Sequence, residues 1–101
     1  DYGELVGRAV ANGECSSGIV VCGSGIGIVM AAGKIPGIRA ATVHDVTSAR
    51  LAREHNDANV IGIGARLVGE QIALDAVDAY LSAVFFGGRH ADRVKKLNLL
   101  D

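Results

Sequence analysis

The sequence predicts an α/β fold in which helices cover a parallel β-sheet, and three observations support this prediction. The chain has 101 residues, a length that suits one domain with a single core. Half of its residues are hydrophobic, only 4% are aromatic and 14 are glycines, which suits closely packed layers. Short apolar runs alternate with segments of helical periodicity, as in strands joined by right-handed crossovers.

The first elements are a helix, a strand and a second helix. Apolar residues near the start recur at helical spacing: Tyr2, Leu5, Val6 and Val10. Asn12-Gly13 then ends the first helix. The run Gly18–Cys22 is short, apolar and rich in β-branched residues, as expected for a strand buried on both faces of a parallel sheet. The glycine-rich turn after it opens a helix from about Ile26 to Ala32.

The rest of the chain continues this alternation. Pro36-Gly37 forms a turn before a second strand, and Asp45 is a good N-cap for the helix after that strand. Two long helices follow the third strand, separated by Gly87-Gly88. The predicted ranges are 39–43 and 59–63 for these two strands, and 45–55, 69–84 and 89–100 for the three helices. No repeat, linker or low-complexity tract divides the chain, so we expect one domain over residues 1–101.

Charge, hydropathy and cysteine spacing exclude several classes of protein. A formal net charge of -1 gives no general attraction to nucleic acid or to an anionic membrane. No apolar run could cross a bilayer, and no basic-then-apolar leader precedes the domain. With a strand at Gly18–Cys22, Cys15 and Cys22 lie roughly 16–23 Å apart, too far for a disulfide. We therefore expect a protein of the reducing cytoplasm.

The carboxyl ends of the strands are the expected place for a ligand site, because parallel sheets bind ligands there. Three segments lie at these ends: Cys22–Gly27, His44-Asp45 and Gly64–Arg66. His55-Asn56 ends a helix instead, which places it at the opposite edge of the sheet. A dimer in which a partner subunit supplies His55 would bring these groups together.

The glycine-rich turn GSGIG suggests a phosphate or dinucleotide loop, but it matches no standard motif. Ile28 stands where the dinucleotide fingerprint needs its third glycine, and where a cysteine phosphatase would need an arginine. A Walker A loop would have one residue fewer before Gly33-Lys34, and a Ser or Thr in place of Ile35. Cys22 remains, beside backbone donors that favour a catalytic thiolate, with a packed core thiol as the alternative. We expect no catalytic role for Cys15.

The histidines and arginines allow more than one interpretation. His55 lies in the last turn of a helix, where the helix dipole favours it with or without chemistry. We interpret His44-Asp45 as a strand end and a helix cap. Arg89, His90 and Arg93 share one face of the last helix near its glycine-lined start, which suits either solvent or a phosphate.

Four separated stretches carry a family resemblance. In order they are GIVVCGSGIG, AGKIPGIRAA, SARLAREHNDANVIGIGAR and GGRHADRV. Together they resemble the type B ribose-5-phosphate isomerase family, which includes the allose- and galactose-6-phosphate isomerases. The resemblance implies a Rossmann-like three-layer αβα sandwich and an aldose-ketose isomerase of sugar phosphates. It also implies a homodimer or homotetramer with shared active sites, and no metal, nucleotide or other cofactor.

The resemblance implies a role for each matched residue. Cys22 matches the base that moves a proton between C1 and C2, Ser24 stands near the sugar oxygens, and His55 matches the histidine that opens the furanose ring. The loop glycines match an anion hole for the enediolate, Asn56 a substrate contact, and the arginines the phosphate site. The matched substrate-binding residues are Gly23, Gly25, Gly27, Asn56, Arg66, Arg89, His90 and Arg93.

The chain departs from the family pattern at two places. Gly33 stands where the family usually has an asparagine. The first strand of the family ends in an Asp-His pair that has no counterpart upstream of Asp1. We therefore expect the first strand or strands of the family to be absent from this chain, which then holds part of the site.

The expected function is the reversible isomerisation of ribose 5-phosphate and ribulose 5-phosphate through a cis-enediolate. His55 favours a pentose, because the cysteine-bearing subunit of the galactose 6-phosphate enzymes in this family lacks that histidine. Three alternatives stay open: a related isomerase of allose or galactose 6-phosphate, a nucleotide-binding module that uses the glycine loop, and a non-catalytic subunit or scaffold.

Overall fold

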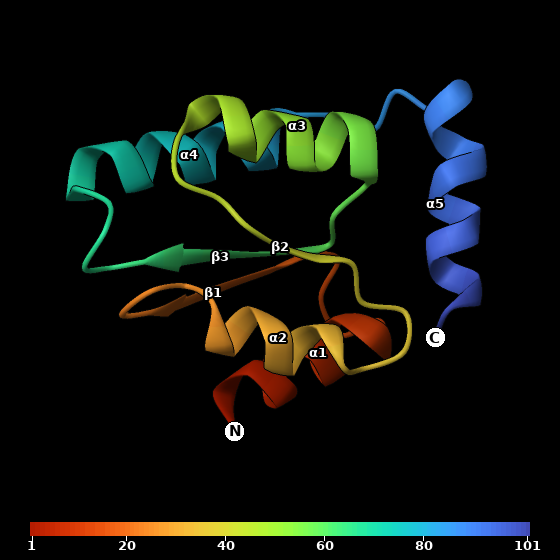
Figure 1. Cartoon of the computed structure of the whole chain (residues 1–101), viewed down its shortest axis with the longest axis horizontal. Helices are drawn as coiled ribbons and strands as arrows, with labels where there is room; N and C mark the ends of the chain where they lie inside the picture. Colours follow the sequence, from red (N-terminus) through yellow and green to blue (C-terminus); the bar gives the residue numbers. More distant parts are fainter.

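A computed structural model describes all residues 1–101 as three layers (Figure 1). The middle layer is a parallel sheet with the strand order β1-β3-β2, made of β1 (Gly18–Cys22), β2 (Ala40–Thr42) and β3 (Val60–Gly64). The helices are α1 (Tyr2–Ala11), α2 (Gly27–Gly33), α3 (Val46–Asn56), α4 (Glu70–Ser82) and α5 (Arg89–Leu99). The first two cover one face of the sheet, the next two cover the other face, and α5 stands at one end. The predicted α/β class, parallel sheet and order of elements are confirmed.

The core divides between the two faces of the sheet. Alternate residues of a strand point to opposite faces, and β3, the central strand, is buried along its whole length. On the α3 and α4 side, the buried residues are Val43, Ala49, Ala52, Ala58, Ile61, Ile63, Ala76 and Tyr80. On the α1 and α2 side, they are Val10, Val20, Ala32, Ile38 and Val60. Both clusters include residues of β3, so this strand joins the two halves of the core.

Strand β1 is buried on one face only, which corrects the prediction that it is buried on both. It pairs with β3 along one edge, and no strand pairs with its other edge. Val20 is 3% exposed, whereas Ile19 is 37% and Val21 is 56% exposed. The apolar run therefore identified the strand correctly but did not indicate that the strand lies at the edge of the sheet.

Helix α1 is present as predicted, but the residues that dock it are different. Tyr2 and Leu5, part of the predicted apolar stripe, are exposed, while Gly3, Gly7 and Val10 are buried. A Cβ atom at Gly3 would lie 2.6 Å from the carbonyl oxygen of Ile28, so this glycine lets α1 approach the backbone of α2. Close contact between small residues therefore docks this helix.

Helix α3 has well-defined ends, which fix the residues of its last turn. At its start, Asp45 accepts a hydrogen bond from Ser48 N at 2.7 Å, and Asp45 N donates to Ser48 Oγ at 3.2 Å. The bond from the Ser48 backbone N–H is the largest cause that lowers the pKa of the Asp45 carboxyl group, and the Ser48 side chain adds to it. The structure confirms this residue as a helix cap. At its end, Asp57 adopts the left-handed conformation with φ of 47°.

Candidate functional site

Cys22 lies at the carboxyl end of β1, where backbone hydrogen bonds tie β1 to the end of β3. Ala65 N donates to Cys22 O at 2.7 Å, and Arg66 N donates to Gly23 O at 3.0 Å. The segments 22–27 and 64–66 therefore meet at the carboxyl end of the sheet, as their places in the sequence predicted. Cys15 is exposed in a distant turn, and both cysteines are free thiols.

The glycine turn packs directly on the backbone of β3. Gly25 has a φ of 73°, and a Cβ atom there would lie 2.8 Å from Gly64 N. A Cβ atom at Gly64 would in turn lie 2.5 Å from Ser24 O. Glycine is therefore required on both sides of this contact. The resulting turn directs Gly25 N to Cys22 Sγ, at 3.1 Å.

Backbone N–H groups set the acidity of Cys22. The hydrogen bond from the backbone of Ile28 contributes most to lowering the pKa of the thiol, and those from Gly25 and Ser24 add to it against the opposing effect of desolvation. The Ser24 side chain also contributes, and its Oγ accepts a hydrogen bond from Ile26 N at 3.2 Å. The half-buried Cys22 is therefore suited to form a thiolate, which can act as a base or as a nucleophile.

Arg66 completes this first group of residues, which we call the Cys22 cluster: Cys22–Gly27 and Arg66. Its side chain crosses Gly23, because a Cβ atom placed on that glycine would lie 3.3 Å from Arg66 Nε. The Arg66 guanidinium makes no ion pair within the chain. It therefore presents a positive charge beside the glycine turn, at Gly23.

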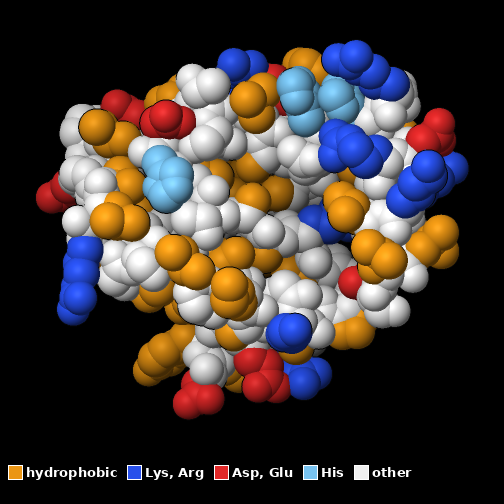
Figure 2. Space-filling model, viewed as in Figure 1, with side chains coloured by type: hydrophobic (Ala, Val, Ile, Leu, Met, Phe, Trp, Pro, Cys, Tyr) orange, Lys and Arg blue, Asp and Glu red, His pale blue; other side chains and the backbone are white.

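A second group, the His55 cluster, forms where α5 meets the end of α3: His55, Asn56, Arg89, His90 and Arg93. The rings of His55 and His90 stack with centroids 4.4 Å apart and 12° between their planes. Arg93 donates to His55 O at 2.6 Å and to Asn56 Oδ1, and its NH2 lies 3.1 Å from His90 Nδ1. Figure 2 shows two adjacent histidines among arginine and lysine side chains.

Desolvation and nearby positive charges keep the ring of His90 neutral over a wider pH range. Desolvation is the largest cause that lowers the pKa of His90, followed by the charges of His55, Arg89 and Arg93. A neutral ring can accept a hydrogen bond at Nδ1, which matches the position of the Arg93 guanidinium. Arg89 makes no ion pair within the chain, so the cluster keeps an exposed cation.

The two clusters lie at opposite ends of the strands (Figure 1). Helix α3 connects two parallel strands, so it runs back to the end where the strands begin, and His55 lies at that end. Cys22 lies at the carboxyl end of the strands. Arg66 is therefore separated from Arg89 and Arg93, and the three arginines that we predicted to hold one phosphate together do not meet within one chain. The predicted separation of Cys22 and His55 agrees with the structure.

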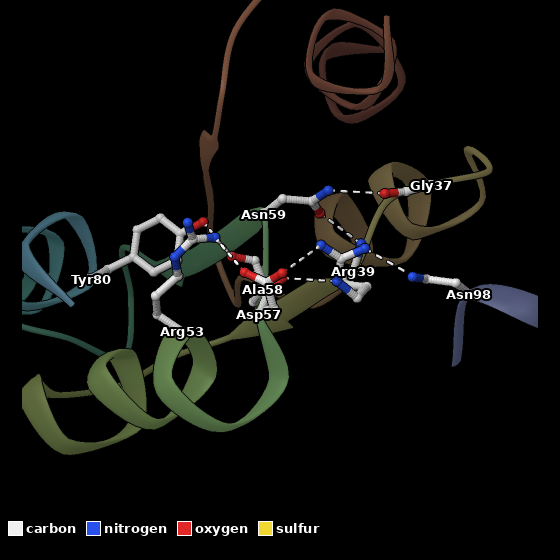
Figure 3. A network of polar contacts seen from close by, with 8 residues as sticks. All are labelled: Gly37, Arg39, Arg53, Asp57, Ala58, Asn59, Tyr80 and Asn98. Carbon is white, nitrogen blue, oxygen red and sulfur yellow. Dashed lines mark hydrogen bonds and ion pairs between the residues drawn. The ribbon is translucent and has the colours of Figure 1, made fainter. Parts of the chain in front are cut away.

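The sequence did not predict a polar network that begins at Asp57, directly after the His55-Asn56 pair (Figure 3). Arg39, which we predicted only as the first residue of a strand, donates to the carbonyl of Asp57 and to the side chain of Asn98. Asp57 directly follows His55-Asn56 and is the only residue besides glycine with a positive φ. The sequence carried one signal for it: an aspartate beside asparagines at the predicted end of a helix, where left-handed conformations are common.

No three histidine, cysteine, aspartate or glutamate side chains come together in a group that could hold a metal ion. None of the five helices has the length and apolar character needed to cross a membrane. At the predicted site, the groups that can bind a small ligand are the amides, hydroxyl and thiol of the Cys22 cluster and the cations of the His55 cluster. This donor set suits an oxygen-rich anion.

Comparison with known proteins identifies relatives along the whole chain. A sequence model of the family described as Ribose/Galactose Isomerase matches residues 1–97. Ribose-5-phosphate isomerase B of Escherichia coli is 46% identical over 99% of this chain and 67% of its own length. The structure of ribose-5-phosphate isomerase B of Clostridium thermocellum is 54% identical, with a TM-score of 0.97 over 99% of this chain and 68% of that chain.

A third relative was solved with a sugar phosphate. The structure of ribose-5-phosphate isomerase B of Mycoplasma genitalium with bound ribulose-5-phosphate is 39% identical, with a TM-score of 0.95 over 99% of this chain and 66% of that chain. This chain thus spans about two thirds of the length of these relatives. The predicted resemblance is confirmed.

Proposed function

Because this chain belongs to the ribose/galactose isomerase family, we propose that the protein interconverts ribose 5-phosphate and ribulose 5-phosphate. The observation that carries this proposal is the Cys22 thiol, with its lowered pKa, at the end of β1. An acid-base group at this place is what an isomerase needs to move a proton between two carbons. The relative that binds ribulose-5-phosphate supports a pentose over a hexose phosphate.

The Cys22 thiolate acts as the base in this reaction. It takes the proton from C2 of the open-chain aldose, which gives a thiol and a cis-enediolate. A proton then passes from O2 to O1, and the thiol returns its proton to C1, which gives the ketose and restores the thiolate. The Ser24 hydroxyl and the amides of the glycine turn lie beside the thiol, where they can stabilise negative charge on the substrate oxygens.

We propose that each complete site combines the Cys22 cluster of one subunit with the His55 cluster of a partner subunit. His55 would open the furanose ring, Asn56 would contact the sugar, and Arg89 and Arg93, with His90, would bind the phosphate near Arg66. Exposed apolar residues border both clusters, as a buried contact between subunits requires. Ile26 of the Cys22 cluster is 50% exposed, and Leu67, which follows Arg66, is 63% exposed. Phe86 is 62% exposed, with its ring centroid 5.9 Å from that of His55.

The alternative of a nucleotide-binding loop is less well supported. Ile28 stands where the dinucleotide fingerprint needs its third glycine, so the turn lacks the pattern of a nucleotide-binding loop. Catalysis by a thiolate also requires reduced Cys22, and the two free cysteines support the reducing cytoplasm as the location.

Substitution of Cys22 tests the proposed reaction. Cys22→Ser should fold and bind the sugar phosphate, yet lose several orders of magnitude in turnover, because serine is a much weaker base than a thiolate. Turnover is measured by interconversion of ribose 5-phosphate and ribulose 5-phosphate. The matched control Cys15→Ser should retain wild-type turnover. Comparable turnover in Cys22→Ser, or a folded wild-type protein with no turnover, would refute the proposal.

A mixing experiment tests the shared site. Cys22→Ser and His55→Ala proteins, each inactive alone, are unfolded together and refolded. In a two-fold dimer, half of the pairs are mixed and each holds one intact site, so the mixture should regain about a quarter of wild-type activity. A site contained within one subunit would regain none.

A further inference from the structure

We propose that Arg39 is a positioning residue that fixes α5, and with it Arg89 and Arg93, relative to the end of α3. The inference rests on the proposed function, because it takes α5 as the helix that binds the phosphate of the substrate. Arg39 itself touches no reacting atom. It acts through the two segments that it joins.

One guanidinium spans both segments (Figure 3). Arg39 Nε donates to the carbonyl oxygen of Asp57 at 2.8 Å, and NH2 lies 3.4 Å from Asp57 Oδ2. NH1 donates to Asn98 Oδ1 of α5 at 3.0 Å. Because the guanidinium is planar and its donors point in fixed directions, these bonds define both the distance and the orientation between the segments.

Asp57 connects the hydrogen bonds of Arg39 to the end of α3. Its left-handed conformation ends the helix directly after Asn56. Its carboxylate also binds Arg53 at 2.8 Å, so two arginines and the last helical turn hold this residue. Arg39 therefore contacts the residue that sets the direction of the chain as it leaves His55-Asn56.

Apolar packing contributes little to the position of α5. Val94 is its only buried residue, and Leu97 is 42% exposed. A cavity of about 350 Å³ lies between α5 and β2, lined by residues that include Leu97, Asn98, Ile38 and Ala40. Polar contacts must therefore hold the helix in place. Arg93 does so near its beginning and Arg39 near its end, where Asp101 also accepts a hydrogen bond from Gly37 N at 2.6 Å.

The test compares Arg39→Ala and Asn98→Ala with a matched control in the same network. Tyr80→Phe removes a buried hydrogen bond from the Tyr80 hydroxyl to Ala58 O, 2.7 Å long, without a contact to α5. Arg39→Ala should raise KM for ribose 5-phosphate and the inhibition constant of inorganic phosphate about tenfold, with kcat nearly unchanged. Asn98→Ala should produce a smaller rise of the same kind. Tyr80→Phe should lower thermal stability and leave KM unchanged.

A second readout does not depend on turnover. The stacked rings of His55 and His90 shift each other's proton resonances, so NMR reports directly on the docking of α5. These resonances should move in Arg39→Ala and stay in place in Tyr80→Phe. Unmoved resonances in Arg39→Ala, or an equal rise of KM in Tyr80→Phe, would overturn the inference. If the wild-type protein has no turnover, the proposed function fails while the NMR result still decides the role of Arg39 in docking α5.

Discussion

Cys22 owes its acidity to the shape of the backbone around it, since no neighbouring charge contributes to the lowered pKa of the thiol. The donors are backbone N–H groups, and their directions depend on Gly25 and Gly64 lying in direct contact. Charge-based activation weakens in salt, whereas short hydrogen bonds to a half-buried atom are screened much less. The reactivity of this thiol should therefore depend on the glycine turn and very little on ionic strength.

The first prediction concerns the pH dependence of Cys22. A lowered pKa means that the thiolate forms at lower pH, so iodoacetamide should modify Cys22 with a midpoint below the value of about 8.5 for a free cysteine. Added salt should leave this midpoint nearly unchanged. Ser24→Ala should move it upward, because the Ser24 side chain contributes a hydrogen bond to the thiol. Mass spectrometry of the modified peptide measures the rate at each pH, and a midpoint at or above that of free cysteine would contradict this account.

At the scale of elements, local patterns predicted each helix and strand to within about two residues, because apolar periodicity and capping residues act over a few positions. Burial was predicted less well. The run at Gly18–Cys22 has the composition of a central strand, yet β1 lies at the edge of the sheet, where one face is open. Strand order depends on pairing with residues 60–64, far along the chain, and no local pattern encodes that choice.

The second prediction uses two isoleucines that are direct neighbours in this sheet. Ile19 of β1 pairs in register with Ile61 of β3, but Ile61 is 0% exposed and Ile19 is 37% exposed. Ile61→Val should lower the free energy of unfolding by about 0.5–1.5 kcal/mol, since it removes a fully buried methyl group. Ile19→Val should lower it by less than about 0.5 kcal/mol. Urea denaturation measures both. Equal losses would show that something covers the open face of β1.

At the scale of the whole molecule, the chain separates the groups that the proposed reaction needs. The sequence predicted that Cys22 and His55 lie at opposite ends of the strands, because helices run antiparallel to the strands in a parallel fold. It did not predict how α5 docks. That depends on the bond between Arg39 and Asn98, which lie 59 residues apart in the chain, and on left-handed backbone at Asp57.

The third prediction follows from this separation. If each site needs two subunits, sedimentation should show at least a dimer, and the specific activity should fall when the protein is diluted below the concentration at which the subunits separate. The loss should reverse on concentration. Cys22→Ser should sediment like the wild type, since the thiol is not needed for association. A monomer with full activity would exclude the shared site.

The strand order also determines when the sheet can form during synthesis of the chain. The strands β1 and β2 never pair with each other, because β3 lies between them and is made last. A nascent chain that ends at residue 59 therefore holds two of these three strands and none of the hydrogen bonds between them. The nascent chain then exposes the apolar run of β1 to chaperones and proteases until Val60–Gly64 emerge. Arrival of that single segment allows both strand pairings to form, whereas Ala76 and Tyr80 of α4 join the core only after they are made.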